Sequence, residues 1–149
     1  MNIRLILLIV IITLFFAACE KENETKISSH NSNESHNTSQ NCMNCHKSGG
    51  KGEGWFNVAG SVYKTDLISI YPNADVKLSS EPQGAGTIFN TIEVDRNGNF
   101  YTTESVNFEG GLYVSVIGTN GEEVFMDSKI TNGKCNSCHG SSTEKIWIE

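Results

Sequence analysis

A pattern of two cysteines and a histidine occurs twice in this chain of 149 residues. Residues 42–46 read CMNCH, and residues 135–139 read CNSCH. The pattern C-x-x-C-H is typical of covalent haem attachment, because two thiols at this spacing can form thioethers with the two vinyl groups of one porphyrin. The histidine that follows then lies beneath the iron as its proximal ligand. The candidate haem-binding residues are therefore Cys42, Cys45 and His46 in the first copy, and Cys135, Cys138 and His139 in the second.

Other chemistry is open to the same sulfurs. Two C-x-x-C pairs can hold one structural zinc ion, although this interpretation leaves both histidines unexplained. In an oxidising compartment the pairs can instead form two disulfides, and a C-x-x-C pair can also take part in thiol redox chemistry. We favour two covalently attached c-type haems, because only this interpretation uses the histidine that follows each pair.

Each haem iron also has a sixth position, which the protein fills or leaves open. A methionine there raises the reduction potential, and an empty position permits ligand binding. The chain has four histidines. Two of them are proximal, so His36 and His30 remain as candidate distal iron ligands, together with Met126 at the end of an expected strand. Lys47 and Lys134 are further possibilities. The sequence leaves the choice among them open.

The segments that must position these motifs have the pattern of short strands. Apolar and β-branched residues alternate with small or polar ones, and no helical period persists for three turns. Val76 and Leu78, for example, should lie on one face of a strand. Regularly spaced short strands separated by Gly/Asn turns favour an all-β fold, a small antiparallel Greek-key sandwich. The expected strands are 56–63, 74–80, 86–94, 99–104, 111–118 and 123–126, with a hairpin turn at DRNG (95–98) and a turn at TNGE (119–122).

This part of the chain resembles the carboxypeptidase-regulatory or transthyretin-like β-sandwich. The stretches that carry the resemblance are VAGSVY, NADVKL, VDRNGNFYT and GLYVSVIG, within about residues 56–128. With one C-x-x-C-H segment before the first strand and one after the last, the chain is similar to exported cytochrome-like proteins built on that sandwich. The resemblance implies a di-haem domain over residues 42–149, with the sandwich core at about 56–130.

The N-terminus is typical of an exported lipoprotein. The largely apolar run of twelve residues, 5–16, suits the hydrophobic part of a signal peptide and is short for a membrane span, which needs about 20 residues. Ala17 and Ala18 then precede Cys19, as before a lipidated cysteine, although Phe16 stands where leucine is usual. We expect removal of residues 1–18 and lipid attachment at Cys19, with an uncleaved anchor helix as the alternative. The protein would then be anchored to a bacterial membrane, at the outer membrane or cell surface.

Residues 19–41 are polar and contain one aliphatic residue, Ile27. Such a segment cannot bury enough apolar surface to offset the entropy of ordering it, so we expect a disordered tether. Loss of Arg4 with residues 1–18 takes the formal net charge from −6 to −7. An acidic chain without a basic cluster is a poor partner for nucleic acid.

These observations together favour an electron carrier over an enzyme, with a ligand-sensing or peroxidase-like haem protein as an alternative if one sixth position is open. The expected function is one-electron transfer at the bacterial envelope by a di-haem c-type cytochrome, with redox proteins as partners. If the two motifs projected from opposite ends of the sandwich, self-assembly would also be expected. The alternative is a non-redox binding module, in which the two C-x-x-C pairs clasp a structural zinc.

Overall fold

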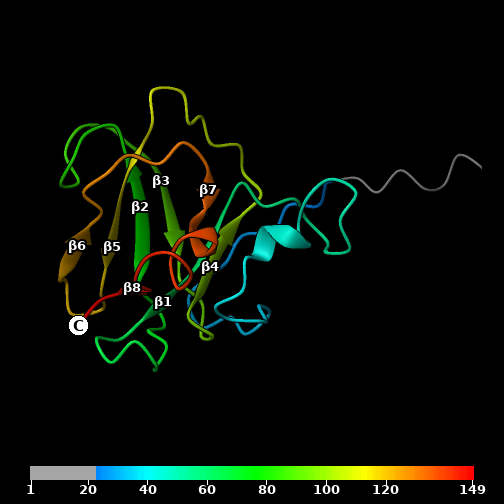
Figure 1. Ribbon diagram of the computed structural model, residues 1–149, viewed down its shortest axis with the longest axis horizontal. Helices are drawn as coiled ribbons and strands as arrows, with labels where there is room; N and C mark the ends of the chain where they lie inside the picture. The colour runs from blue at the N-terminus through cyan, green and yellow to red at the C-terminus, as the bar shows by residue number, and fades with distance from the viewer. Residues whose placement is uncertain (1–22) are drawn as a thin grey trace, which may run out of the picture.

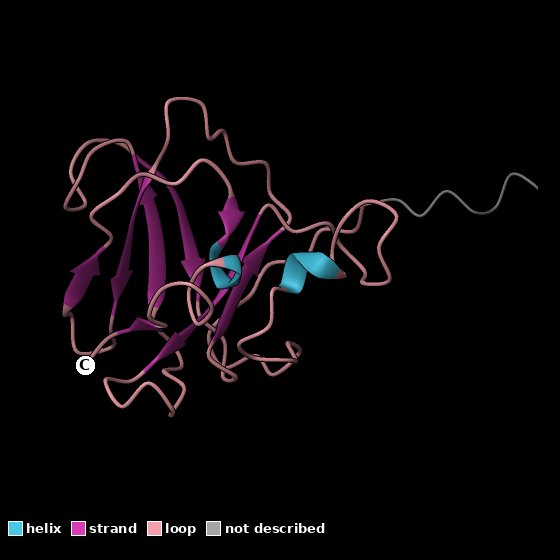
Figure 2. Ribbon diagram, in the orientation of Figure 1, coloured by secondary structure: helices cyan, strands magenta, loops and turns pink. Residues whose placement is uncertain are grey.

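Strands make up nearly all of the regular secondary structure in the described part of the protein (Figures 1 and 2). Its structure is a computed structural model that describes residues 23–149, so the expected signal peptide and the lipid site at Cys19 lie outside the described residues. The elements are η1 (Cys42–Asn44), β1 (Val58–Tyr63), β2 (Asp75–Ser79), β3 (Ile88–Glu93), β4 (Asn99–Thr102), β5 (Tyr113–Ile117), β6 (Glu123–Phe125), β7 (Gly133–Lys134), η2 (Cys135–Ser137) and β8 (Ile146–Trp147), where η marks a 3₁₀ helix. Within residues 23–149, no helix has the length and apolar character needed to cross a bilayer.

The strands form two sheets. One has the order β3-β2-β5-β6 and is antiparallel throughout. In the other, β1 is central and pairs with β4 in antiparallel fashion. The short strands β7 and β8 pair with β1 in parallel. The all-β prediction is confirmed, and the two parallel pairings add a mixed character that the sequence did not indicate.

A single hydrophobic core lies between the sheets. Val58, Val62 and Phe100 contribute from the β1 sheet, and Val76 and Leu78 contribute from β2. The alternation of Val76 and Leu78 puts both side chains on one face, as expected, and both are fully buried. Each expected strand between residues 56 and 126 is present, with ends that differ by a few residues.

The turn at residues 95–98 has a different role from the one expected. It joins β3 to β4, which belong to different sheets, so it carries the chain across the sandwich instead of closing a hairpin between paired strands. The Asp95 side chain accepts hydrogen bonds from the amides of Asn97 (2.9 Å) and Asn99 (3.0 Å). Gly98 has φ +75°, and a Cβ there would lie 2.8 Å from Ile70, so glycine is required. The TNGE turn does close a hairpin, between β5 and β6.

The polar segment before the first motif corrects the prediction of a disordered tether. Residues 23–41, here called the N-terminal arm, lie against the sandwich. Ile27 forms an isolated antiparallel bridge with Thr102, the last residue of β4. The Ser28 amide donates to the Tyr101 carbonyl (2.9 Å). The Ser28 hydroxyl donates to the Glu93 carbonyl (2.6 Å), and Ser28 is only 2% exposed. The composition argument failed because it counted apolar surface, whereas hydrogen bonds to the open edge of β4 hold the arm.

Candidate haem-attachment sites

The two C-x-x-C-H motifs have the same local fold. In each, the first cysteine begins a single 3₁₀ turn, and the second cysteine ends it with nearly equal backbone angles, φ/ψ −107°/−42° at Cys45 and −112°/−53° at Cys138. The His46 amide donates to the Cys42 carbonyl (2.9 Å), and the His139 amide donates to the Cys135 carbonyl (3.0 Å). The backbone therefore follows the same path from the first cysteine to the histidine in both motifs.

Both histidines are also anchored in the same way. The Nδ1 atom of His46 lies 2.8 Å from the Glu53 carbonyl oxygen, and Nδ1 of His139 lies 2.7 Å from that of Glu144. Because a carbonyl oxygen can only accept a hydrogen bond, each Nδ1 must carry the proton. The lone pair is then on Nε2. A backbone carbonyl that fixes the ring through its other nitrogen is the usual support for a metal-ligating histidine.

The two motifs lie side by side on the β1 sheet. Asn136, inside η2, is only 8% exposed and bonds to both neighbouring segments. Its side-chain amide donates to the Gln40 carbonyl (3.0 Å), two residues before the first motif, and to the Ser61 hydroxyl (3.0 Å). Its carbonyl oxygen accepts from the Ser61 amide on β1 (3.1 Å). One side chain of the second motif thus ties the first motif to the central strand.

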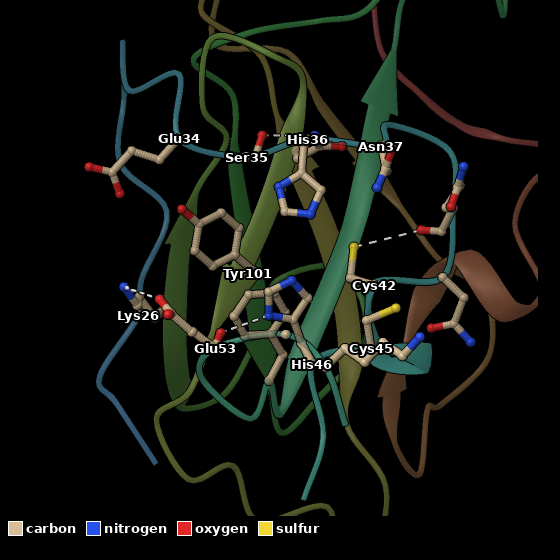
Figure 3. A pocket seen from close by; sticks show the side chains of 16 residues that line it. Lys26, Glu34, Ser35, His36, Asn37, Cys42, Cys45, His46, Glu53 and Tyr101 are labelled. Carbon is tan, nitrogen blue, oxygen red and sulfur yellow. Dashed lines mark hydrogen bonds and ion pairs between the residues drawn. The ribbon is translucent and has the colours of Figure 1, made fainter. Parts of the chain in front are cut away.

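A pocket of about 510 Å³ opens at the first motif, and Figure 3 shows it from close by. Its size is within the range of pockets that enclose small organic ligands and cofactors. The sulfurs of Cys42 and Cys45 lie along one side, and the rings of His36 and His46 lie across the pocket from one another (Figure 3). The His46 ring is stacked on Phe56, with centroids 4.2 Å apart, and Phe56 is stacked on Tyr101 at 4.7 Å.

The pocket also holds charges of both signs. Lys26 and Lys51 line it together with Glu34 and Glu53. The Lys26 ammonium lies 3.8 Å from Glu53 and 3.1 Å from Glu24, and these contacts raise the pKa of Lys26. The pKa of the nearby Tyr101 phenol is raised by burial, so this hydroxyl stays protonated at neutral pH. The two lysines carry the positive charge that would pair with carboxylates on a bound cofactor.

The second motif is much more open to solvent. A crevice of about 10 Å³ lies beside His139, lined among others by Tyr63 and Lys145. Cys138 is exposed and His139 is half-buried. A haem attached here would lie on the protein surface, whereas one at the first motif would enter a pocket.

The four thiols are unpaired and differ in environment. Cys45 and Cys138 are exposed, whereas Cys135 packs against the hydrophobic core. Burial, with a smaller contribution from the neighbouring Cys42, raises the pKa of the Cys135 thiol to about 12. Burial likewise raises the pKa of Cys42. Reactive C-x-x-C pairs depend on a lowered pKa, so the shifts at Cys42 and Cys135 have the opposite sign from that expected for thiol redox chemistry.

No three His, Cys, Asp or Glu side chains within residues 23–149 gather closely enough to hold a metal ion. A Cys₄ zinc site would need such a group, since zinc takes all its structural ligands from the protein. A haem iron does not need one, because the porphyrin supplies four of its ligands and the protein only the axial ones. The haem interpretation and the zinc interpretation both remain predictions.

The candidate distal ligands fall in very different places. His36 lines the pocket, with its ring centroid 5.8 Å from that of His46. His30 does not line the pocket, and its Nε2 lies 3.1 Å from Asp75 and 3.2 Å from the Ala74 carbonyl. Met126 follows β6, on the side of the molecule opposite η1 (Figure 1). Lys47 and Lys134 are exposed and line neither the pocket nor the crevice. Of these candidates, only His36 is brought to a motif.

Sequence reasoning missed several residues that build the site. Asn136 and Ser61 join the two motifs, and Tyr101 forms part of the pocket wall. An asparagine inside a short C-x-x-C loop was a weak signal of such a bond. Nothing in the sequence pointed to Ser61, because its role depends on which strand is central.

Comparisons with protein-family models, with curated proteins and with solved structures found no match to this chain.

Proposed function

We propose that this protein is a di-haem c-type cytochrome that carries single electrons at the bacterial cell envelope. The observation that carries the proposal is the matched geometry of the two motifs. Each has the same 3₁₀ turn, and each histidine donates Nδ1–H to a backbone carbonyl, which leaves Nε2 as the free ligand atom. Two unrelated cysteine pairs would have no reason to share this anchoring.

The chain's own residues would divide the work as follows. The two cysteines of each motif would bind one porphyrin through thioethers, and His46 or His139 would ligate its iron. A haem so held accepts and returns one electron at a time. The Glu53 and Glu144 carbonyls keep the imidazoles in the ligating tautomer. The pocket at the first motif would cover one face of a bound haem, and such cover affects the potential through solvent access.

The position of the motifs favours electron exchange within one molecule. The Asn136–Gln40 hydrogen bond sets the two attachment segments next to each other. Self-assembly was expected only if the motifs projected from opposite ends of the sandwich. Motifs that lie next to each other give no ground for proposing it. We further propose the Greek-key, transthyretin-like type for the sandwich, a lipid anchor on Cys19 at the outer membrane or cell surface, and redox proteins as partners.

The experiment is expression with cytochrome c maturation factors, followed by optical spectroscopy, pyridine haemochrome assay and intact mass measurement. We expect two haems per chain. The double variants C42S/C45S and C135S/C138S should each retain one haem, because each removes both thioethers of one site. The matched control is Cys19→Ser, which should lose the lipid and keep both haems.

A mature protein whose mass is accounted for by its amino acids and lipid would contradict the proposal. So would a colourless protein that contains one zinc ion per chain. The zinc-stapled binding module would then be the better account.

A further inference from the structure

The two haem sites of the proposed cytochrome are built unequally. We propose that His36 is the second axial ligand at the first site, and that the second haem keeps an open sixth position which binds a small exogenous ligand. This inference rests on the proposed function. It adds a ligand-binding centre to an electron carrier and assigns the two roles to different ends of the chain.

The proposal that His36 is the second axial ligand at the first site rests on its position relative to His46. Their ring centroids are 5.8 Å apart, and the rings are inclined by 41°. Two imidazoles on opposite sides of one metal ion, each with its nitrogen about 2 Å away, have ring centres roughly 6 Å apart. Nδ1 of His46 is held by Glu53, and its other nitrogen points toward the His36 ring (Figure 3). The spacing and direction therefore match a pair of axial ligands.

The fold holds His36 at this place by its neighbours. The Asn97 side-chain amide donates to the Ser35 carbonyl (2.7 Å), and that of Asn99 donates to the hydroxyls of Ser35 (2.8 Å) and Thr38 (3.0 Å). Asn97 and Asn99 thus hold the arm by hydrogen bonds on both sides of His36. Within residues 23–149, the His36 ring has no hydrogen-bond partner, whereas the His30 ring lies against Asp75 and the Ala74 carbonyl.

The proposal that the second haem keeps an open sixth position rests on where the other histidine and methionine side chains lie. The chain has four histidines, so His30 is the one left for the second site, and its ring is engaged at the start of β2. Met126 lies beyond β6, and Met43 is buried and lines neither the pocket nor the crevice. Within the described part of the chain, no imidazole or thioether therefore shares the crevice with His139.

One amine does lie beside His139, and it is occupied. Lys145 lines the crevice, but its ammonium donates to the Leu67 carbonyl (2.9 Å) and sits 4.1 Å from the centre of the Tyr63 ring. A lysine that ligated the iron would first have to leave both of these partners. Lys145 is thus set to border the open position and not to fill it.

Carbon monoxide is the probe for this inference, because it binds reduced haem at an open position. The reduced holo-protein should bind one carbon monoxide per two haems. His36→Ala should bind two, and the matched control His30→Ala should still bind one. Electron paramagnetic resonance of the oxidised protein should show one low-spin and one high-spin haem, and His36→Ala should lose the low-spin signal. His36→Met should raise the potential of one haem, because a thioether replaces an imidazole.

Haem content measured on every sample separates the two levels of inference. A preparation without haem overturns the proposed function, and this inference with it. If two haems are present, a wild-type protein that binds two carbon monoxide molecules, or a His36→Ala variant that still binds one, overturns the role of His36. Wild-type protein that binds none overturns the open second site. If His36→Ala fails to retain both haems, His36→Met is measured instead. A raised potential at one haem supports the role of His36, and an unchanged potential and spin state overturn it.

Discussion

The surroundings of each side chain decide which of the four sulfurs in the two motifs can react in the chain without a cofactor. Cys45 and Cys138 face solvent, whereas Cys135 packs against the core and Cys42 is partly covered. Burial disfavours the charged thiolate, so the pKa values of Cys42 and Cys135 are raised. Each attachment pair therefore contains one accessible and one protected thiol.

Alkylation of the haem-free chain tests this difference. At pH 8 iodoacetamide should modify Cys45 and Cys138 first, and Cys135 should react at a comparable rate only as the pH approaches its pKa of about 12. Mass spectrometry of peptides after timed labelling measures the order. In urea all four thiols should react alike. Equal rates in the folded chain would show that the burial of Cys135 is not maintained without haem.

At the scale of elements, the N-terminal arm acts as an extra edge for the β1 sheet. Ser28 is the main contact, because its hydroxyl donates to the Glu93 carbonyl (2.6 Å) and accepts from the Tyr101 amide (2.9 Å). It thereby touches both the end of β3 in one sheet and β4 in the other. The arm that carries His36 is thus fastened by a residue that composition alone assigns to a flexible tether.

Ser28→Ala should loosen the arm. It leaves the Tyr101 amide without its side-chain acceptor and should cost about 1–2 kcal/mol in the free energy of unfolding. Trypsin should then cleave after Lys26 faster than in the wild-type protein. Ser29→Ala is the matched control, since Ser29 is exposed and contributes only its backbone carbonyl to a bond with Ser32. Unchanged cleavage in Ser28→Ala would contradict this role.

At the scale of the molecule, the sequence predicted more of the scaffold than of the site. The strands between residues 56 and 126 follow from alternation and turn residues, which are local signals. The pairing of β7 and β8 with β1 could not be predicted, because strands of two residues carry no periodicity. His36 could be named as a candidate but not preferred to His30, since the choice depends on a turn about sixty residues later in the chain.

The C-terminal segment packs into the hydrophobic core of the molecule. Ile148 is fully buried in the core, and its amide donates to the Tyr63 carbonyl (3.0 Å). Ile148→Ala should lower the free energy of unfolding by about 2–5 kcal/mol because it leaves a cavity. Urea denaturation measures the loss. Ile68→Ala is the control, since Ile68 is 81% exposed and its loss should change the stability by less than about 0.5 kcal/mol. Similar midpoints for the two variants would contradict a core role for Ile148.

The bond between Asn136 and Gln40 spans 96 positions of sequence, and the contact between Asn136 and Ser61 spans 75. Contacts of such long range form late and slowly during folding. If the chain is exported with its N-terminus first, as proposed, Cys42 and Cys45 would leave the cytoplasm well before residue 136. The segment around Cys42 would then lack its hydrogen bond to Asn136 for most of the proposed export, and an enzyme that attached porphyrin would meet it as an open peptide.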